Sequence, residues 1–145
     1  MRPKIFKYKF VGISIFIFEL FVTMLFGYGS YDSFIEFSSV NIFSIENFIF
    51  IFALMIFITA VLCLITIIFR IKKSIYCLNV NLFLILLFFL VGYIKLLIND
   101  DFRSDDNLKL MITISVTLVF IFLTNFFKYK EIEFLEIDNI GTHND

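Results

Sequence analysis

Residues Phe48 to Phe69 read FIFIFALMIFITAVLCLITIIF, a stretch of 22 residues that holds no charge, glycine or proline. As an α-helix this stretch would be roughly 33 Å long, at about 1.5 Å of rise per residue. The hydrocarbon core of a bilayer is about 30 Å thick, so such a helix is long enough to cross it. The sequence therefore predicts a transmembrane helix here, and the rest of the chain is interpreted around it.

The composition also points to lipid as the surrounding solvent. Apolar residues make up 61% of the 145 residues, and 23 residues are Phe. Soluble domains usually contain about 45–50% apolar residues. The length suits one domain. We expect the lipid bilayer to be the principal partner, and we expect no nucleic-acid partner.

Three further apolar stretches accompany the first. They predict an all-α integral membrane four-helix bundle in one domain over 1–127, with helices near 10–28, 48–69, 78–98 and 108–127. A charged cytoplasmic tail over 128–145 would follow. The basic start and the first apolar stretch also fit a secretory signal. The stretch exceeds the usual 7–15 residues and has Glu19 at its middle, which favours an uncleaved helix.

The polar stretch between the first two predicted helices has its own signals. Tyr31, Phe34 and Ile35 share a helical spacing, as do Phe37 and Val40, which predicts a short helix lying on the membrane surface. Ser44 is a suitable N-cap for the second helix, and Glu46 in its first turn is favoured by the helix dipole.

The distribution of basic residues predicts the orientation. Nine of them lie in the N-terminal segment, in the loop between the second and third helices and at the start of the tail, whereas the opposite loops hold only two. Cytoplasmic loops are enriched in Lys and Arg. We therefore predict a multi-pass protein of the cell inner (plasma) membrane with both termini in the cytoplasm.

Glu19 and Lys95 are ionisable residues within apolar stretches, and such residues are functional candidates. They could pair across the first and third helices. In the alternative, Lys95 extends its ammonium group to the outer surface, and Glu19 stays protonated or is bonded inside the bundle. A proton relay would need further acidic or His partners at that depth, and the other stretches supply none.

The predicted outer loops are acidic, with seven acids and only two bases, Arg103 and Lys109. This face is either simply solvated or attracts a cationic partner, because a patch of one sign raises encounter rates. The candidate partner-binding residues are Asp32, Glu36, Asp100, Asp101, Asp105 and Asp106.

Small and weakly polar residues recur on two helix faces. One set is Thr59, Cys63 and Thr66, and the other is Thr113, Thr117 and Thr124. Such residues mark helix contacts in membranes. The two cysteines, Cys63 and Cys77, belong to no CxxC or Cys/His pattern, so they predict buried or lipid-facing thiols rather than a disulfide or metal framework.

Sequence motifs of catalysis are missing from the chain. It has no Gly-rich phosphate loop, no GxSxG and no HExxH, and its one His lies in the tail. We expect a non-enzymatic protein without catalytic, cofactor-binding or metal-binding residues.

In size and predicted topology the chain resembles the immunity proteins that protect bacteria from pore-forming toxins, a resemblance that covers architecture only. It implies a protein that binds another membrane-active protein, cationic or pore-forming, at the outer face. The alternative is a small transporter, or an accessory subunit of one, that uses Glu19 for coupling. Four helices are few for a pathway through one monomer, so this alternative would need a homo-oligomer or a partner.

Overall fold

The computed structural model describes residues 4–35, 37, 44–71, 73–98 and 104–129. They form four α-helices, which are α1 (Lys9–Ile35), α2 (Ile45–Ile68), α3 (Ser74–Ile98) and α4 (Ser104–Phe126). Each helix is long and apolar enough to cross a membrane, which is the pattern of a multi-pass membrane protein. The predictions of four helices and of an all-helical fold are thus confirmed.

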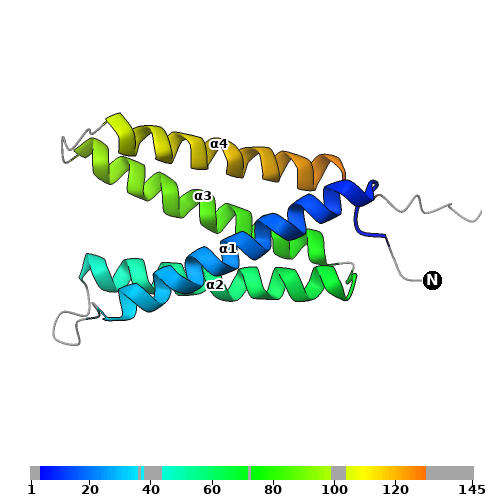
Figure 1. The fold of residues 1–145 in the computed structure, drawn as a ribbon, viewed down its shortest axis with the longest axis horizontal. Helices are drawn as coiled ribbons and strands as arrows, with labels where there is room; N and C mark the ends of the chain where they lie inside the picture. Colours follow the sequence, from blue (N-terminus) through cyan, green and yellow to red (C-terminus); the bar gives the residue numbers. More distant parts are fainter. Residues whose placement is uncertain (1–3, 36, 38–43, 72, 99–103, 130–145) are drawn as a thin grey trace, which may run out of the picture.

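The helices alternate in direction, and α1 crosses α2 and α3 (Figure 1). It packs most extensively against α2 and makes only a narrow contact with α4. One end of the bundle holds the described residues 4–9, 69–71, 73–74 and 126–129, and we call it the basic end. The other end holds the described residues 32–35, 37, 44–46, 95–98 and 104–109, and we call it the acidic end.

The predicted helix over Tyr31 to Val40 is wrong as a separate element, because α1 continues without a break to Ile35. The buried stripe of α1 extends into this part, since Ser30 is 7% exposed and its hydroxyl donates to the Gly27 carbonyl at 3.0 Å. This packing continues the helix past Gly29, whose cost in a helix is about 1 kcal/mol. Val40 lies outside the described residues.

The start of α2 confirms the predicted cap. The backbone N–H of Asn47 donates to the Ser44 hydroxyl at 3.2 Å, and Glu46 lies in the first turn. The other helices also begin before their apolar stretches, α3 at Ser74 and α4 at Ser104. Polar residues extend these helices beyond the strictly apolar spans, which sequence hydropathy alone does not reveal.

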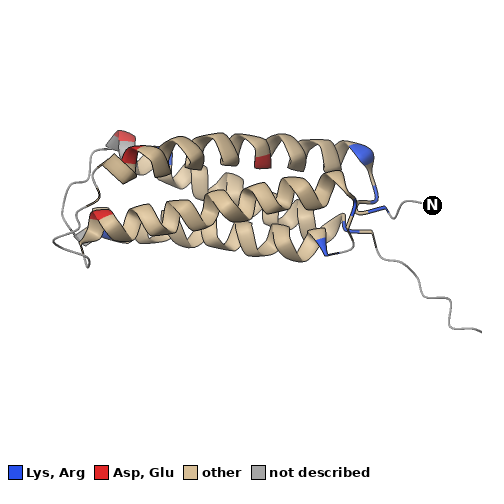
Figure 2. Cartoon of the chain, turned by 90° about the horizontal axis from the view of Figure 1, so that it is seen from below, with Lys and Arg blue, Asp and Glu red and all other residues tan. Residues whose placement is uncertain are grey.

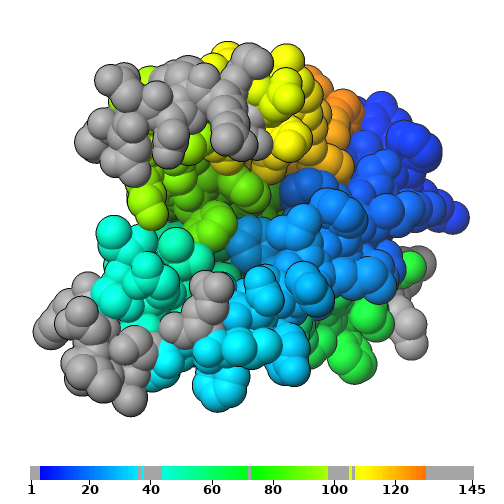
Figure 3. Space-filling model, turned by 60° about the vertical axis from the view of Figure 1, so that its left-hand side comes forward, coloured from blue at the N-terminus to red at the C-terminus, as the bar shows by residue number. Residues whose placement is uncertain are grey.

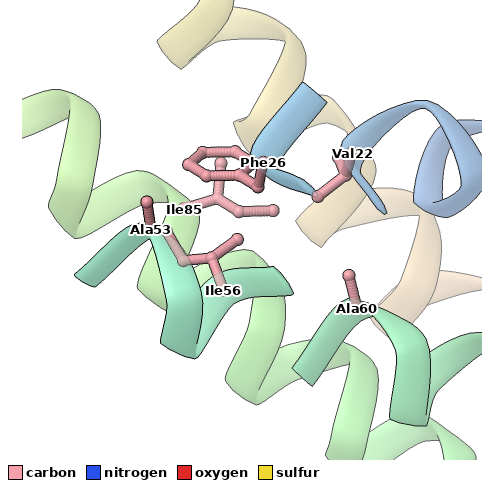
Figure 4. Close-up of a cluster of buried hydrophobic side chains, with 6 residues drawn as sticks. All are labelled: Val22, Phe26, Ala53, Ile56, Ala60 and Ile85. Carbon is pink, nitrogen blue, oxygen red and sulfur yellow. The ribbon is translucent and has the colours of Figure 1, made fainter. Parts of the chain in front are cut away.

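The core consists of one side of each helix. On α1 the buried residues recur every three or four positions, as Val11, Ile15, Glu19, Val22, Phe26 and Ser30. Toward the acidic end, Val22 and Phe26 meet small residues of α2, Ala53 and Ala60, and Ile85 of α3 (Figure 4). Small side chains at this contact let the helix backbones approach closely.

The two ends of the described chain join at the basic end. The backbone N–H of Lys7 donates to the Phe127 carbonyl at 2.9 Å, and that of Tyr129 donates to the Ile5 carbonyl at 2.8 Å. Phe6 and Lys128 thus form an isolated antiparallel bridge. The predicted tail over 128–145 lies outside the described residues except for its first two positions.

Candidate functional site

A chain of three polar side chains connects α1, α3 and α2 inside the bundle. The amide of Asn81 donates to Glu19 Oε2 at 2.7 Å, and the Thr59 hydroxyl lies 2.8 Å from Asn81 Oδ1. Glu19 and Asn81 are both completely buried. Three helices are therefore joined at one point by hydrogen bonds between side chains.

Regular packing aims Glu19 into this site. It occupies the buried stripe of α1, between Ile15 and Val22, so its side chain must point toward the other helices. Among the described residues its second carboxyl oxygen, Oε1, is buried and has no hydrogen-bond partner. A carboxylate with a single amide partner is costly at such a position, so the arrangement favours the neutral acid.

The predicted pair of Glu19 and Lys95 is wrong. Lys95 is exposed and interacts electrostatically with Glu46 at the acidic end. The proposed pairing assumed that the first helix ends near Tyr28, whereas α1 extends to Ile35. Glu19 is thus 16 residues from the end of its helix and Lys95 three from the end of α3, a difference of 13 residues or about 20 Å. No lysine stem spans that distance.

The alternative of a carboxyl bonded inside the bundle is the one observed, but its partner was missed. Asn81 lies within the third apolar stretch, where a strongly polar side chain is a recognised sign of a contact between membrane helices. Two further asparagines carried the same signal. The side-chain amides of Asn79 on α3 and Asn125 on α4 donate to each other's oxygens, at 3.1 and 2.7 Å.

The weakly polar faces predicted for α2 and α4 are helix contacts. Thr59 bonds to α3, and Thr117 and Thr124 are buried. Cys63 is buried as well, and its sulfur lies 3.2 Å from that of Cys77 on α3. Both thiols are free. The sequence placed Cys63 in the second predicted helix and Cys77 one residue before the third, without indicating that they meet.

Among the described residues, charges separate along the bundle, with most basic residues at the basic end and most acidic residues at the acidic end (Figure 2). Asp32 in the last turns of α1 and Asp105 at the start of α4 are exposed at the acidic end. Asp106 is helical, but its side chain is not described. Glu36, Asp100 and Asp101 lie outside the described residues, so the structure places only part of the predicted acidic surface.

A shallow apolar groove opens between α1 and α4, above α3 (Figure 3). Its volume is about 220 Å³. Phe21 and Leu25 line it from α1, Phe89 from α3, and Thr113 and Val116 from α4. The groove exists because α1 crosses away from α4 toward the acidic end.

The described residues contain no group of three or more His, Cys, Asp or Glu side chains that could hold a metal ion. No protein-family profile, curated protein or solved structure matches this chain.

Proposed function

We propose that this protein is a multi-pass protein of the plasma membrane that acts without catalysis, by binding another membrane-active protein at its outer face. The immunity proteins against pore-forming toxins exemplify this kind of function. The observation that carries the proposal is the gathering of exposed acids, including Asp32 and Asp105, at one end of the bundle. A surface of one sign attracts a cationic partner and speeds its encounter.

The proposal places the basic end in the cytoplasm and the acidic end outside. The contact of Lys7 with Phe127 keeps both ends of the described chain on one side of the bundle, beside basic residues. This agrees with the positive-inside rule. Labelling of a single cysteine at Asp105, in a variant without Cys63 and Cys77, tests the orientation. An impermeant maleimide should react on intact cells, and reaction only after lysis would contradict the proposal.

Partner binding is tested by neutralising the acidic end. Asp100, Asp101, Asp105 and Asp106 are replaced together by Asn, and association with a cationic pore-forming peptide is measured on vesicles that contain the full chain. We expect slower association at low salt and little difference at high salt, because exposed charges act mainly on the on-rate.

The matched control neutralises the same number of charges at the basic end, by changing Lys4, Lys7, Lys9 and Lys128 to Gln. In vesicles whose acidic ends face the peptide, this variant should bind the peptide as the unchanged protein does. Unchanged association of the Asp-to-Asn variant at low salt would leave the acidic end as a merely solvated surface.

A second candidate function is a small transporter, or an accessory subunit of one, in which Glu19 couples transport to protonation. The observation that favours it is the buried Oε1 of Glu19, which has no hydrogen-bond partner among the described residues. Such an atom could exchange a proton with a passing substrate. Proton flux into vesicles should then be lost in Glu19→Gln, and equal flux in the two proteins would exclude this role.

A further inference from the structure

The two cysteines meet where α2 and α3 lie against each other near the basic end. Cys63 donates a hydrogen bond to the Cys77 sulfur, and the sulfurs are 3.2 Å apart. The sulfurs of a disulfide are about 2.0 Å apart, so they need to approach by only about 1 Å to bond. Apart from the thiol hydrogen, no atom can lie between two sulfurs at this separation.

The hairpin that joins α2 to α3 keeps the sulfurs of Cys63 and Cys77 close together. Arg70 adopts a left-handed conformation with φ of 52°, which ends α2. The backbone N–H of Ile71 then donates back to the Thr66 carbonyl at 3.0 Å. The Ser74 hydroxyl, at the start of α3, lies 2.8 Å from that same carbonyl. The turn is thus tied to both helices, and the register that brings the sulfurs together is fixed by several bonds.

The two thiols differ in access. Cys63 is completely buried, whereas Cys77 is partly exposed. Tyr76 and Val80, which lie close to Cys77 along α3, are exposed and belong to a candidate membrane span. Cys77 belongs to the same candidate span, so a reagent dissolved in lipid can reach this thiol. Cys77 is therefore the thiol that a reagent meets first, and Cys63 lies behind it.

We propose that Cys63 and Cys77 form a redox-active dithiol that a lipid-soluble quinone oxidises to an intramolecular disulfide. Both S–H bonds break, and one S–S bond forms. The two electrons and two protons pass to the quinone oxygens, which gives one hydroquinone for each disulfide. Cys77 meets the quinone first, and Cys63 completes the disulfide. This inference is independent of the proposed binding function.

The disulfide would join α2 to α3 covalently. It would close a loop that contains the whole turn between them, residues 64–76. The oxidised protein is then a bundle whose middle hairpin cannot open, and thiol–disulfide exchange returns it to the reduced form.

The test uses the full chain in lipid vesicles with a short-chain benzoquinone. The chain has only two cysteines, so every thiol signal is assigned without ambiguity. We expect both thiols to become inaccessible to N-ethylmaleimide after denaturation, and the mass to fall by two hydrogens. One hydroquinone should form per protein molecule, and dithiothreitol should restore both thiols. These measurements need no variant.

Cys63→Ser and Cys77→Ser are the matched controls, and each should abolish stoichiometric hydroquinone formation. Four outcomes would overturn the proposal: two thiols that still react with maleimide, a covalent quinone adduct in place of the disulfide, disulfides between two molecules only, or oxidation by aqueous diamide but not by the quinone. The last outcome would place the oxidant in water rather than in lipid.

Discussion

Replacing Asn81 by Leu should expose how much the buried polar chain contributes to stability. The change removes the 2.7 Å hydrogen bond to Glu19. The Thr59 hydroxyl is not left unpaired, because the backbone carbonyls of Met55 and Ile56 still lie 2.9 and 3.0 Å from it. A side-chain hydrogen bond between membrane helices contributes about 0.6 kcal/mol on average and up to about 1.7. Leaving a buried polar group without a partner costs about 1–3 kcal/mol. We therefore expect Asn81→Leu to lower the free energy of unfolding by about 2–3 kcal/mol.

Combining this change with Glu19→Leu separates the bond from the burial of its partners. Removing both members of a hydrogen-bonded pair can be nearly neutral, because neither is left unsatisfied. The double variant should therefore be no less stable than Asn81→Leu alone, with a coupling energy of about 1–2 kcal/mol. Reversible unfolding in mixed detergent micelles, followed by circular dichroism, measures all four proteins. Strictly additive losses would refute the assignment of Asn81 as the partner of Glu19.

Two control changes on α3 test whether the coupling with Glu19 is specific to Asn81. Asn79→Leu lies two residues before Asn81 and affects a bond to Asn125 instead. Lys95→Ala removes the partner that sequence reasoning had suggested for Glu19. Among the described residues, neither Asn79 nor Lys95 forms a hydrogen bond with Glu19, so each change should be additive with Glu19→Leu within about 0.5 kcal/mol. Coupling between Glu19 and Lys95 would contradict the structure.

Two further changes test the helix contacts and the cap. An alanine Cβ at Gly27 would lie 3.0 Å from the Phe57 ring, whereas one at Gly29 would meet nothing within 4 Å. Gly29→Ala should therefore stabilise the protein by up to about 1 kcal/mol, and Gly27→Ala should be less favourable than this control when both are unfolded in micelles. Equal effects would contradict the close approach of α1 and α2. Ser44→Ala should cost about 1 kcal/mol by removing the acceptor for Asn47, and an unchanged free energy of unfolding would contradict the cap.

The helices were predictable because hydropathy and length are local properties of the sequence. The Ser44 cap is local too, and so are the threonine faces that turned out to be helix contacts. The contact between Glu19 and its partner Asn81 is not local in the sequence. It depended on where α1 ends, and hydropathy placed that end at Tyr28 because the following residues are polar. The helix continues to Ile35, which shifts the depth of every α1 residue relative to α3.

The meeting of Cys63 and Cys77 escaped prediction for a related reason. Their separation in the sequence fits many hairpins, and only the turn at Arg70 fixes which faces of α2 and α3 oppose each other. The joining of residues 5–7 to residues 127–129 is likewise a contact between segments that are far apart in the sequence. Neither contact leaves a periodic pattern.

Polar contacts have a special importance in a bundle of this composition. In lipid, a Phe, Ile or Leu side chain gains little by facing another helix rather than a hydrocarbon tail. Apolar surface therefore selects the inner face of each helix only weakly. Glu19, Asn81 and Thr59 do select it, because their hydrogen-bonding groups have no partner in lipid.

These polar contacts lie at the middle of the bundle and toward the basic end, where the Asn79–Asn125 pair and the thiol pair also occur. Toward the acidic end the core is formed by aromatic rings such as Phe26 and Phe88, and α1 crosses away from α4. Contacts between such rings fix helix register less strictly than hydrogen bonds do, since they tolerate several geometries. Under the proposed binding function, we therefore expect the helices of the acidic half to adjust to the partner, while the polar contacts keep the rest of the bundle in register.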